Sequence, residues 1–331
     1  MSLLKEGRPG EAYLGFAVVR GKQLKSTRDG KPYVRLELGD ASGRLFAKVW
    51  EKAKERYAKI REGDVVKVKG VFESFDGKVE LRISRIRPAE EGEVELSQLL
   101  PGSNRDVEAL LERFREHLEN ISSEPLKQLL SVLFPTWDDY LQMLKAPSGK
   151  LWHHNCEYGT LEEAVFLMDV ANTVVEHYPE LDRDLLIVGI ILRSTGRVAE
   201  FRNAGFFDYS DAGRLLGGGV LARDRFLEAV NQLEDFPEEL KLQISHLLLC
   251  QAYKSEEERA VLPQTPEAIL LDLLLKLSAT VNAVQRIVQN DLPEDRRWTR
   301  FNNLLGRFIY VTDKSENNPD HENGQNMKME K

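Results

Sequence analysis

The sequence predicts a two-part α+β protein, in which a small β-rich module precedes a larger all-helical body. The first 88 residues alternate between polar and apolar positions and contain Asp-Gly turn signals, a pattern typical of antiparallel strands. From about residue 106 onward, apolar residues recur at three- and four-residue spacing, which is typical of helices. A length of 331 residues leaves room for two separate cores.

Five strands and one short helix are expected in the N-terminal module. The strands are predicted over 13–21, 33–38, 44–50, 65–75 and 78–88, with a charged helix over 51–60. Period-2 alternation places Val34, Leu36 and Leu38 on one face of the second strand. Three strands, a short helix and two further strands are the order of a five-stranded OB barrel. This domain is predicted over residues 1–90.

The charge of the chain divides at the same boundary. Residues 1–88 hold 21 basic and 12 acidic side chains, a net charge of +9, whereas the remainder holds 25 basic and 42 acidic, a net charge of −17. A basic module joined to an acidic body indicates a part that binds polyanions, with a merely solvated basic face as the alternative.

OB barrels bind single strands by stacking bases on exposed aromatic rings, while cations follow the backbone. The candidate nucleic-acid-binding residues are therefore Lys31, Tyr33, Arg35, Phe46, Lys48, Lys69, Phe72, Phe75, Arg82 and Arg85. The alternative for each ring is that it fills the barrel, because small barrels need interior bulk. Tyr33 and Phe75 flank turns, so they are expected to be the exposed rings.

The second part begins after an acidic linker over 91–104 that contains Pro and Gly. Helices are expected over 107–120, 124–134, 161–178, 183–194, 223–236, 237–253 and 265–289, with no strand signal between them. These helices define an all-α domain over 105–312, large enough for its own core. The tail over 313–331 has no hydrophobic run and is predicted to be disordered.

Composition excludes several other classes of protein. No run of about 18 apolar residues is present, so a transmembrane helix and a membrane partner are not expected. The first residues lack an apolar core followed by a cleavage site, so no secretory signal is predicted. Two cysteines, Cys156 and Cys250, are too few for a disulfide framework and fit a reducing compartment. A cytoplasmic location is therefore expected.

Motifs in both parts resemble one known family. The first part carries Gly30, Tyr33, Leu38, Asp40, Gly43, Ala47 and Trp50 in the pattern G-x-Y, L-x-D-x-S-G and A-x-x-W. The second part carries LWHHNCEYGTLEEA, DYSDAGRLLGG and WTRFNNLLGRFIY in order. Together these segments resemble the YhaM-type 3′→5′ exoribonucleases, in which an OB domain precedes an HD (His-Asp) phosphohydrolase domain.

The resemblance implies a divalent metal centre, but this chain departs from the family at the ligand positions. The positions that carry the ligands in active members are occupied here by Glu163, Arg193, Ser194, Gly218, Gln251, Ala252 and Ser278. Arg193 brings a permanent positive charge that repels a metal ion. The sequence therefore predicts a degenerate domain without catalytic residues and without a cofactor. The alternative is a working site that holds a divalent metal such as Mn or Mg.

The relict cleft is expected to contain His153, His154, Glu163, Arg193 and His246. Without a metal, the His153–His154 pair is expected to be packed or capping, and His246 to be a satisfied core residue. Two readings of Arg193 stay open. It binds an anion together with Arg197, Arg202 and Arg214, or it pairs with Glu163 and fills the cleft.

The function expected from these observations is binding of single-stranded nucleic acid, with the helical body as a scaffold or a surface for a protein partner. The preference for RNA over DNA rests on the resemblance alone. One alternative is a metal-dependent 3′→5′ exoribonuclease or phosphohydrolase that tolerates the changed ligands. Another is an adaptor whose barrel binds protein, because fold alone does not fix function.

Overall fold

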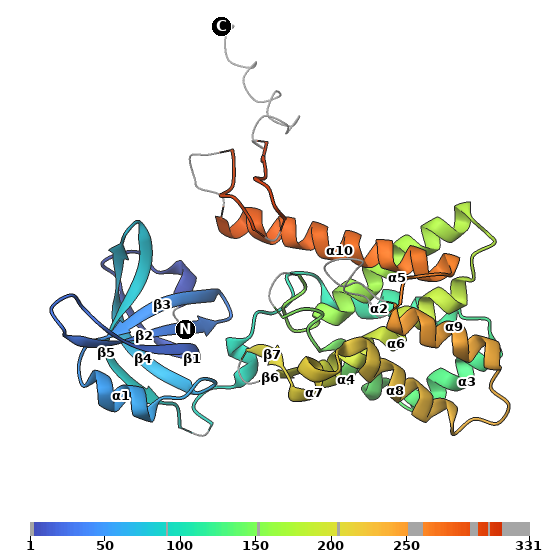
Figure 1. Cartoon of the computed structure of the whole chain (residues 1–331), viewed down its shortest axis with the longest axis horizontal. Coiled ribbons are helices and arrows are strands. Elements are labelled where there is room, and N and C mark those ends of the chain that lie inside the picture. Colours follow the sequence, from blue (N-terminus) through green and yellow to red (C-terminus); the bar gives the residue numbers. More distant parts are fainter. Residues whose placement is uncertain are drawn as a thin grey trace, which may run out of the picture.

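The structure is a computed structural model that describes residues 3–90, 92–150, 153–203, 206–250, 261–291, 297–303 and 305–312. A barrel and a helical domain lie side by side along the long axis of the molecule (Figure 1). Each has its own cluster of buried apolar side chains. The α+β fold class with an N-terminal five-stranded barrel and a following helical region is confirmed.

The barrel closes through the strand order β1-β2-β3-β5-β4. Its elements are β1 (Ala12–Ser26), β2 (Pro32–Asp40), β3 (Gly43–Val49), α1 (Ala53–Lys59), β4 (Val65–Phe75) and β5 (Lys78–Pro88). A short 3-10 helix, η1 (Leu4–Glu6), precedes them. All neighbours are antiparallel except β3 and β5, which pair in parallel. Helix α1 lies between β3 and β4, as the charge pattern predicts.

The alternation of each strand divides the barrel into a filled interior and a polar exterior. Leu36 and Leu38 of β2 and Ala47 of β3 are fully buried, while the residues between them face outward. Phe72 is 2% exposed and packs edge-on against Tyr13, with ring centroids 5.6 Å apart. The prediction that Phe72 contacts nucleic acid is therefore wrong, because its ring is needed to fill the barrel.

The helical domain follows a second 3-10 helix, η2 (Leu96–Leu99). Its helices are α2 (Val107–Glu119), α3 (Glu124–Leu133), α4 (Trp137–Leu144), α5 (Gly159–His177), α6 (Arg183–Glu200), α7 (Asp211–Leu215), α8 (Gly218–Val230), α9 (Glu238–Leu249) and α10 (Pro266–Asp291). Two of these, α4 and α7, were not expected, because they are too short for the apolar spacing to stand out.

One small sheet interrupts the helices, contrary to the expectation of an all-helical body. Strands β6 (Phe201–Asn203) and β7 (Phe207–Tyr209) pair antiparallel directly after α6. Three residues per strand are too few to produce a readable alternation. The hairpin turns the chain back so that α7 and α8 pack against α6.

Helix α6 forms the centre of the helical core. It is buried from Asp184 to Gly196, and the Asp182 carboxylate caps its first turn by accepting from the Leu185 amide at 2.9 Å. Helices α5, α8 and α10 pack around it. A helix buried on all sides places its polar residues, Arg193 among them, inside the domain. Within the described ranges, no helix is both long and apolar enough to cross a bilayer.

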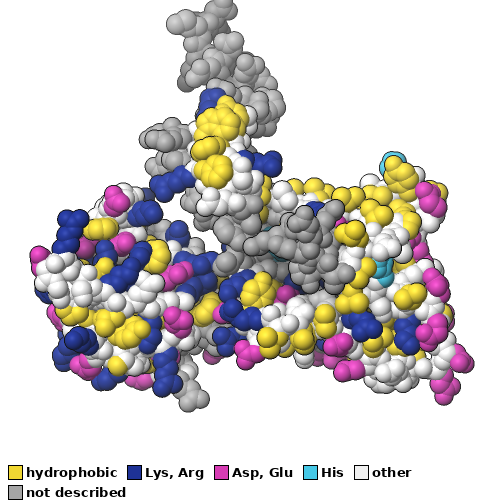
Figure 2. Space-filling view, viewed as in Figure 1, with side chains coloured by type: hydrophobic (Ala, Val, Ile, Leu, Met, Phe, Trp, Pro, Cys, Tyr) yellow, Lys and Arg dark blue, Asp and Glu magenta, His cyan; other side chains and the backbone are white. Residues whose placement is uncertain are grey.

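Charge is distributed unevenly over this surface. Figure 2 shows Lys and Arg side chains over the barrel and along its border with the helical domain, whereas acidic side chains gather at the far end of that domain. Helix α10 runs along the helical domain, and its C-terminal end approaches the barrel (Figure 1). The border between the two parts therefore combines side chains from distant segments of the chain.

Candidate nucleic-acid interface and the ligand-equivalent cleft

A row of three cations crosses the outward face of the barrel. Arg35 of β2 lies directly opposite Lys48 of β3, and Lys48 is in register with Arg82 of β5. Paired residues on neighbouring strands point to the same side of the sheet, so the three side chains form one outward-facing row. We call this surface, with Phe46 and Phe75, the barrel face.

Two exposed aromatic rings lie next to this row. Phe46 is 41% exposed and the Arg35 guanidinium carbon lies 3.9 Å from its ring centroid. Phe75 is 61% exposed and the Lys48 ammonium lies 3.7 Å from its centroid. Each cation holds its ring by a cation–π contact while the ring stays open to solvent. Alternating rings and cations are the combination that single-strand binding requires.

Acidic neighbours restrain two of the three cations. Lys48 pairs with Glu80 and Arg82 with Glu73, each at 2.6 Å. The Arg82–Glu73 pair is exposed and contributes little to stability, so a phosphate can displace that carboxylate at small cost. The side chains of Lys48 and Glu80, in contrast, are only 17% and 13% exposed. Their effect is to keep the cations extended on the barrel face.

The other candidate residues surround the barrel face. Tyr33 stacks on Trp50 with ring centroids 4.8 Å apart, so its ring is half-buried rather than free. Lys31 lies exposed in the turn before β2, and its backbone N–H donates to the Thr27 hydroxyl oxygen at 3.1 Å. Lys69 of β4 and Arg85 of β5 are paired residues that are both exposed.

The cleft of the helical domain is organised around a buried ion pair. Arg193 of α6 donates to Glu163 of α5, with Nη1 and Oε2 2.6 Å apart, and Ser148 donates to the same carboxylate oxygen. The two charged side chains are 8% and 2% exposed as residues. Burial raises the pKa of Glu163, but the charge of Arg193 outweighs burial and holds this pKa well below its usual range.

A second pair extends this arrangement. Arg197, one turn after Arg193, donates to Glu200 at the end of α6. The Glu200 carboxylate lies beside Gly218, where an added Cβ would be 2.6 Å from Glu200 Oε2. Gly218, which the resemblance predicts to stand where the family carries a histidine, has no side chain, and the Glu200 carboxylate occupies the space beside it. Two guanidinium groups and two carboxylates balance one another inside the cleft.

The remaining ligand-equivalent positions face other partners. The Ser194 hydroxyl donates to the Ile190 carbonyl oxygen at 2.9 Å, as serines within helices often do. Ser278 Oγ of α10 lies 3.2 Å from His154 Nε2. Gln251 and Ala252 lie outside the described residues.

The segment between α4 and α5 places the two histidines. His154 is 4% exposed and its Nδ1 lies 2.9 Å from Glu162 Oε2, so it is a packed residue as expected. Its backbone has a φ of +40°, a conformation that costs free energy for a residue with a side chain. Gly159 allows the backbone at the start of α5 to pass close to His154, since a Cβ at position 159 would lie 2.0 Å from the His154 carbonyl oxygen. Burial lowers the pKa of His153 to about 4, so this ring is neutral at pH 7.

His246 lies elsewhere. It is partly exposed on α9, and its Nε2 accepts the backbone N–H of Gln264 at 2.9 Å. Its ring nitrogen has a hydrogen-bond partner, as expected, but the side chain is not part of the core, because this side of α9 faces the segment that precedes α10. In the part of the chain that the structure describes, no contact joins His246 to Glu163 or Arg193.

The sequence leaves two arrangements of Arg193 open, anion binding or pairing with Glu163, and the structure shows the pairing with Glu163. The other arginines expected in an anion-binding cleft are also engaged: Arg202 and Arg214 approach Asp208 at 3.8 and 3.0 Å. Arg202 and Arg214 are more than half exposed and share Asp208 with Lys150, whereas Arg193 and Arg197 pair with Glu163 and Glu200.

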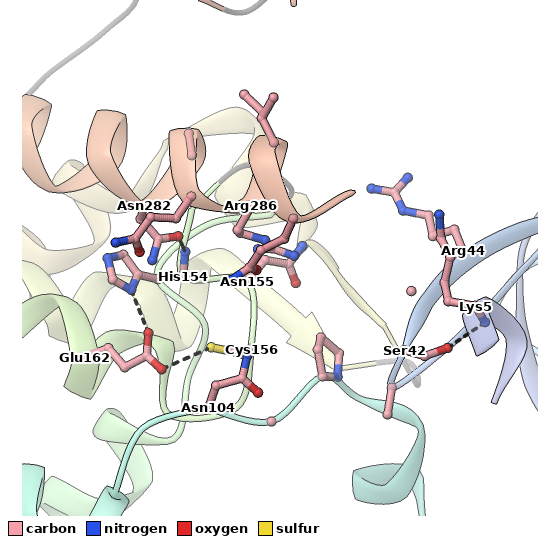
Figure 3. Close-up of a pocket in the computed structure, with 18 of the residues that line it drawn as sticks. Lys5, Ser42, Arg44, Asn104, His154, Asn155, Cys156, Glu162, Asn282 and Arg286 are labelled. Carbon is pink, nitrogen blue, oxygen red and sulfur yellow. Dashed lines mark hydrogen bonds and ion pairs between the residues drawn. The ribbon is translucent and has the colours of Figure 1, made fainter. Parts of the chain in front are cut away.

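A cavity of about 640 Å³ lies at the border between barrel and helical domain. Figure 3 shows Lys5, Ser42 and Arg44 on the barrel side and Arg286 with Cys156 on the other. No motif in the sequence indicates this cavity, because its lining comes from segments up to about 280 residues apart.

The comparisons agree with this architecture. Residues 17–89 match the family model described as an OB-fold nucleic acid binding domain. Two curated proteins named 3′-5′ exoribonuclease YhaM are each 27% identical to this chain. The match to the protein of Oceanobacillus iheyensis covers 86% of this chain and 89% of that protein. The match to the protein of Shouchella clausii covers 88% of this chain and 90% of that protein. Over most of its length the chain is similar in sequence to proteins named as YhaM-type exoribonucleases. The predicted resemblance is confirmed.

Among solved structures, the second OB-fold domain of replication protein A from Methanococcus maripaludis is 21% identical, with 28% of this chain and 98% of that chain covered and a TM-score of 0.23.

The expectation that the protein takes no cofactor is contradicted by these relatives, because YhaM-type exoribonucleases are metal-dependent enzymes. The ligand-equivalent residues of this chain fit such a metal poorly in the arrangement that the structure shows. Arg193 occupies the carboxylate of Glu163, and Ser194, Gly218 and Ser278 offer no imidazole or carboxylate. Among the described residues, no group of three or more His, Cys, Asp or Glu side chains could hold a metal ion. No reaction step through a metal follows from this arrangement.

Proposed function

We propose that the protein binds single-stranded RNA on the barrel face, with the strand laid across β2, β3 and β5. The observation that carries this proposal is the pairing of exposed rings with cations: Phe46 under Arg35 and Phe75 under Lys48. The choice of RNA over DNA is supported by the relatives, which are named as exoribonucleases.

The physical argument is that rings and cations serve different parts of the ligand. A base stacked on an exposed ring contributes about 1–3 kcal/mol whatever its identity, because every base has a π-face. A cation beside the ring meets the phosphate that follows the base, and each such contact releases a counterion. A face of this kind binds with little sequence preference and with strong salt dependence.

The test is binding of labelled oligouridylate to the full chain, measured by fluorescence anisotropy over a salt series. Phe46→Ala combined with Phe75→Ala is expected to weaken binding by about 2–6 kcal/mol, the stacking contribution of two bases. Leu14→Ala is the matched control, because Leu14 is an exposed apolar residue on β1, away from the barrel face. An oligothymidylate of equal length tests the preference for RNA.

Salt-independent binding, or equal affinity in the double variant and the control, would contradict the proposal. That result would favour the adaptor reading, in which the barrel binds a protein.

In this proposal the helical domain acts as a scaffold rather than as a nuclease. The support is the buried Arg193–Glu163 pair at positions where the family resemblance places metal ligands. A guanidinium already bound to the carboxylate competes directly with any cation for it.

The second candidate function is that of a 3′→5′ exoribonuclease. It is favoured by the identity of 27% to proteins of that name over 86–88% of the chain. Incubation of end-labelled RNA with the protein and Mn²⁺ separates the two candidates. Intact RNA supports the scaffold role, whereas shortening from the 3′ end that is abolished by Glu163→Ala establishes the nuclease.

A further inference from the structure

Five cationic side chains are among the residues that line the cavity at the border between barrel and helical domain. Lys5 and Arg44 come from the barrel side, Arg105 from the segment before α2, and Arg286 from α10. Arg20 of β1 completes the group. We call this cavity the border pocket.

The lining holds fewer carboxylates than cations, and its two carboxylates, Asp40 and Glu162, have hydrogen-bond partners within the protein. Arg44 also pairs with Glu37 at 3.1 Å, and Glu37 does not line the pocket. Asp40 accepts the Leu4 amide at 2.7 Å and the Ser42 amide at 2.9 Å. Glu162 accepts from Ser103 and lies 2.9 Å from His154 Nδ1. Five cations against two carboxylates give the lining a net charge of +3, which concentrates anions in a recessed site.

Arg20 is directed into the border pocket by an irregularity of the barrel. The register of β1 against β2 shifts between Val19 and Gly21, so Arg20 is an extra residue in a β-bulge, a feature that re-aims a side chain. Its side chain crosses Gly39, where an added Cβ would lie 2.2 Å from Arg20 Nε. That Nε is buried and has no hydrogen-bond acceptor in the described protein.

The cations repel one another across the border pocket. Burial, with the nearby charge of Arg44, lowers the pKa of Arg20 to about 10. Burial likewise lowers the pKa of Arg286, and Arg44 adds to this effect. In Figure 3, Arg44 and Arg286 reach toward the same space from opposite sides. An anion between them would relieve this repulsion, and a phosphate matches the guanidinium fork.

Strand β3 connects the border pocket with the barrel face. Arg44, Phe46 and Lys48 are alternate residues of β3 that all point outward, while the residues between them are buried. Alternate residues of a strand are spaced by about 6.6 Å, so the row extends about 13 Å from the pocket to the middle of the face. A strand bound on the face therefore has a continuous path into the border pocket.

We propose that the border pocket binds the phosphates of the nucleotides that extend beyond the barrel face, so that one single strand contacts both parts of the protein. This inference rests on the proposed function of the barrel face. The size of the cavity suits one or two nucleotides, because ligand pockets of about 300–1,000 Å³ hold molecules of that size.

The test compares a short and a long oligouridylate, of about 4 and about 14 nucleotides, on the full chain. The variant is Lys5→Gln with Arg105→Gln, and because both residues are exposed the variant is expected to keep the fold, which its melting curve checks. The long strand is expected to bind about tenfold more weakly at about 0.1 M salt, with the slope of log affinity against log salt less negative by about 1.4, the value for two phosphate contacts. Binding of the short strand is expected to be unchanged.

The control is Lys127→Gln with Lys241→Gln, which removes the same charge from exposed or half-exposed positions on α3 and α9, at the end of the molecule away from the barrel (Figure 1). A second variant, Arg286→Gln, tests the pocket from α10, with the melting curve as a check on folding.

The outcomes separate the two proposals. If the short strand binds and depends on Phe46 and Phe75, but the pocket variants and the control bind the long strand equally, the border pocket proposal is overturned and the barrel face stands. If neither strand depends on Phe46 and Phe75, the proposed function fails first.

Discussion

Removal of one partner of the buried Arg193–Glu163 pair is expected to destabilise the helical domain strongly. In Arg193→Met, the Glu163 carboxylate stays 2% exposed and keeps only the Ser148 hydroxyl as hydrogen-bond donor. An uncompensated buried charge costs about 3–5 kcal/mol. For a domain of this size, each kcal/mol lowers the melting temperature by about 2–4 °C, so the expected decrease is about 6–20 °C.

The double variant Glu163→Gln with Arg193→Met removes both charges while it keeps similar volumes. Replacement of a whole buried pair by neutral groups is often close to neutral in stability, so most of the loss should be recovered. The assay is thermal unfolding followed by the helical far-ultraviolet signal, with the free energy taken from urea titration. Lys59→Met is the control, because it breaks an exposed pair with Glu55 that contributes less than about 1 kcal/mol.

The reasoning is refuted if Arg193→Met and the double variant lose the same amount of stability. That result would mean that the contact acts through packing alone and that neither charge is desolvated. It would also remove the argument that the guanidinium competes with a cation for Glu163.

Three further results are expected. The pKa of His153 is about 4 in the folded protein and near 6.5 in the unfolded chain, so between these pH values the unfolded chain binds one more proton than the folded protein. The free energy of unfolding should therefore fall by about 3 kcal/mol from pH 6.5 to pH 4. Urea titrations of His153→Gln should show a smaller decrease. Gly196→Ala should cost about 1–3 kcal/mol or more in the same assay, because the new Cβ would lie 2.1 Å from the Gly218 carbonyl oxygen of α8, whereas an equal melting temperature would contradict that close approach. Burial and the neighbouring Glu162 raise the pKa of Cys156 to about 12, so iodoacetamide should label this thiol slowly at pH 8 until urea unfolds the chain; rapid labelling of the folded protein would show that the thiol is not desolvated.

Local sequence pattern predicts the barrel and the long helices, but not the short elements. Alternation and turn signals predict the five strands of the barrel, and apolar spacing predicts the long helices, because both depend on which face of an element is buried. The predicted strands over 65–75 and 78–88 match β4 and β5 residue for residue. The elements that were missed, α4, α7 and the β6–β7 hairpin, are stabilised by packing against α6 rather than by a long period of their own.

Site residues were predicted less completely, and Phe46 and Phe72 illustrate the reason. Both are aromatic residues of barrel strands, yet one is 41% exposed and the other 2%. Phe72 faces inward against Tyr13, whereas Phe46 faces outward beside Arg35. Since a one-residue shift of register exchanges the two faces, residue type alone does not separate a core ring from a binding ring.

By itself, the sequence determined the two-part organisation and the charge contrast between the parts, and its resemblance to the family predicts that Glu163, Arg193 and others stand at the ligand positions. Only the tertiary structure decided what these residues contact: Arg193 pairs with Glu163 from another helix, and Arg44 meets Arg286 across the border pocket. The physical reason is that periodicity is a local property of the chain. Charge pairing and cavity shape, in contrast, depend on distances between residues far apart in sequence, which only the packed fold sets.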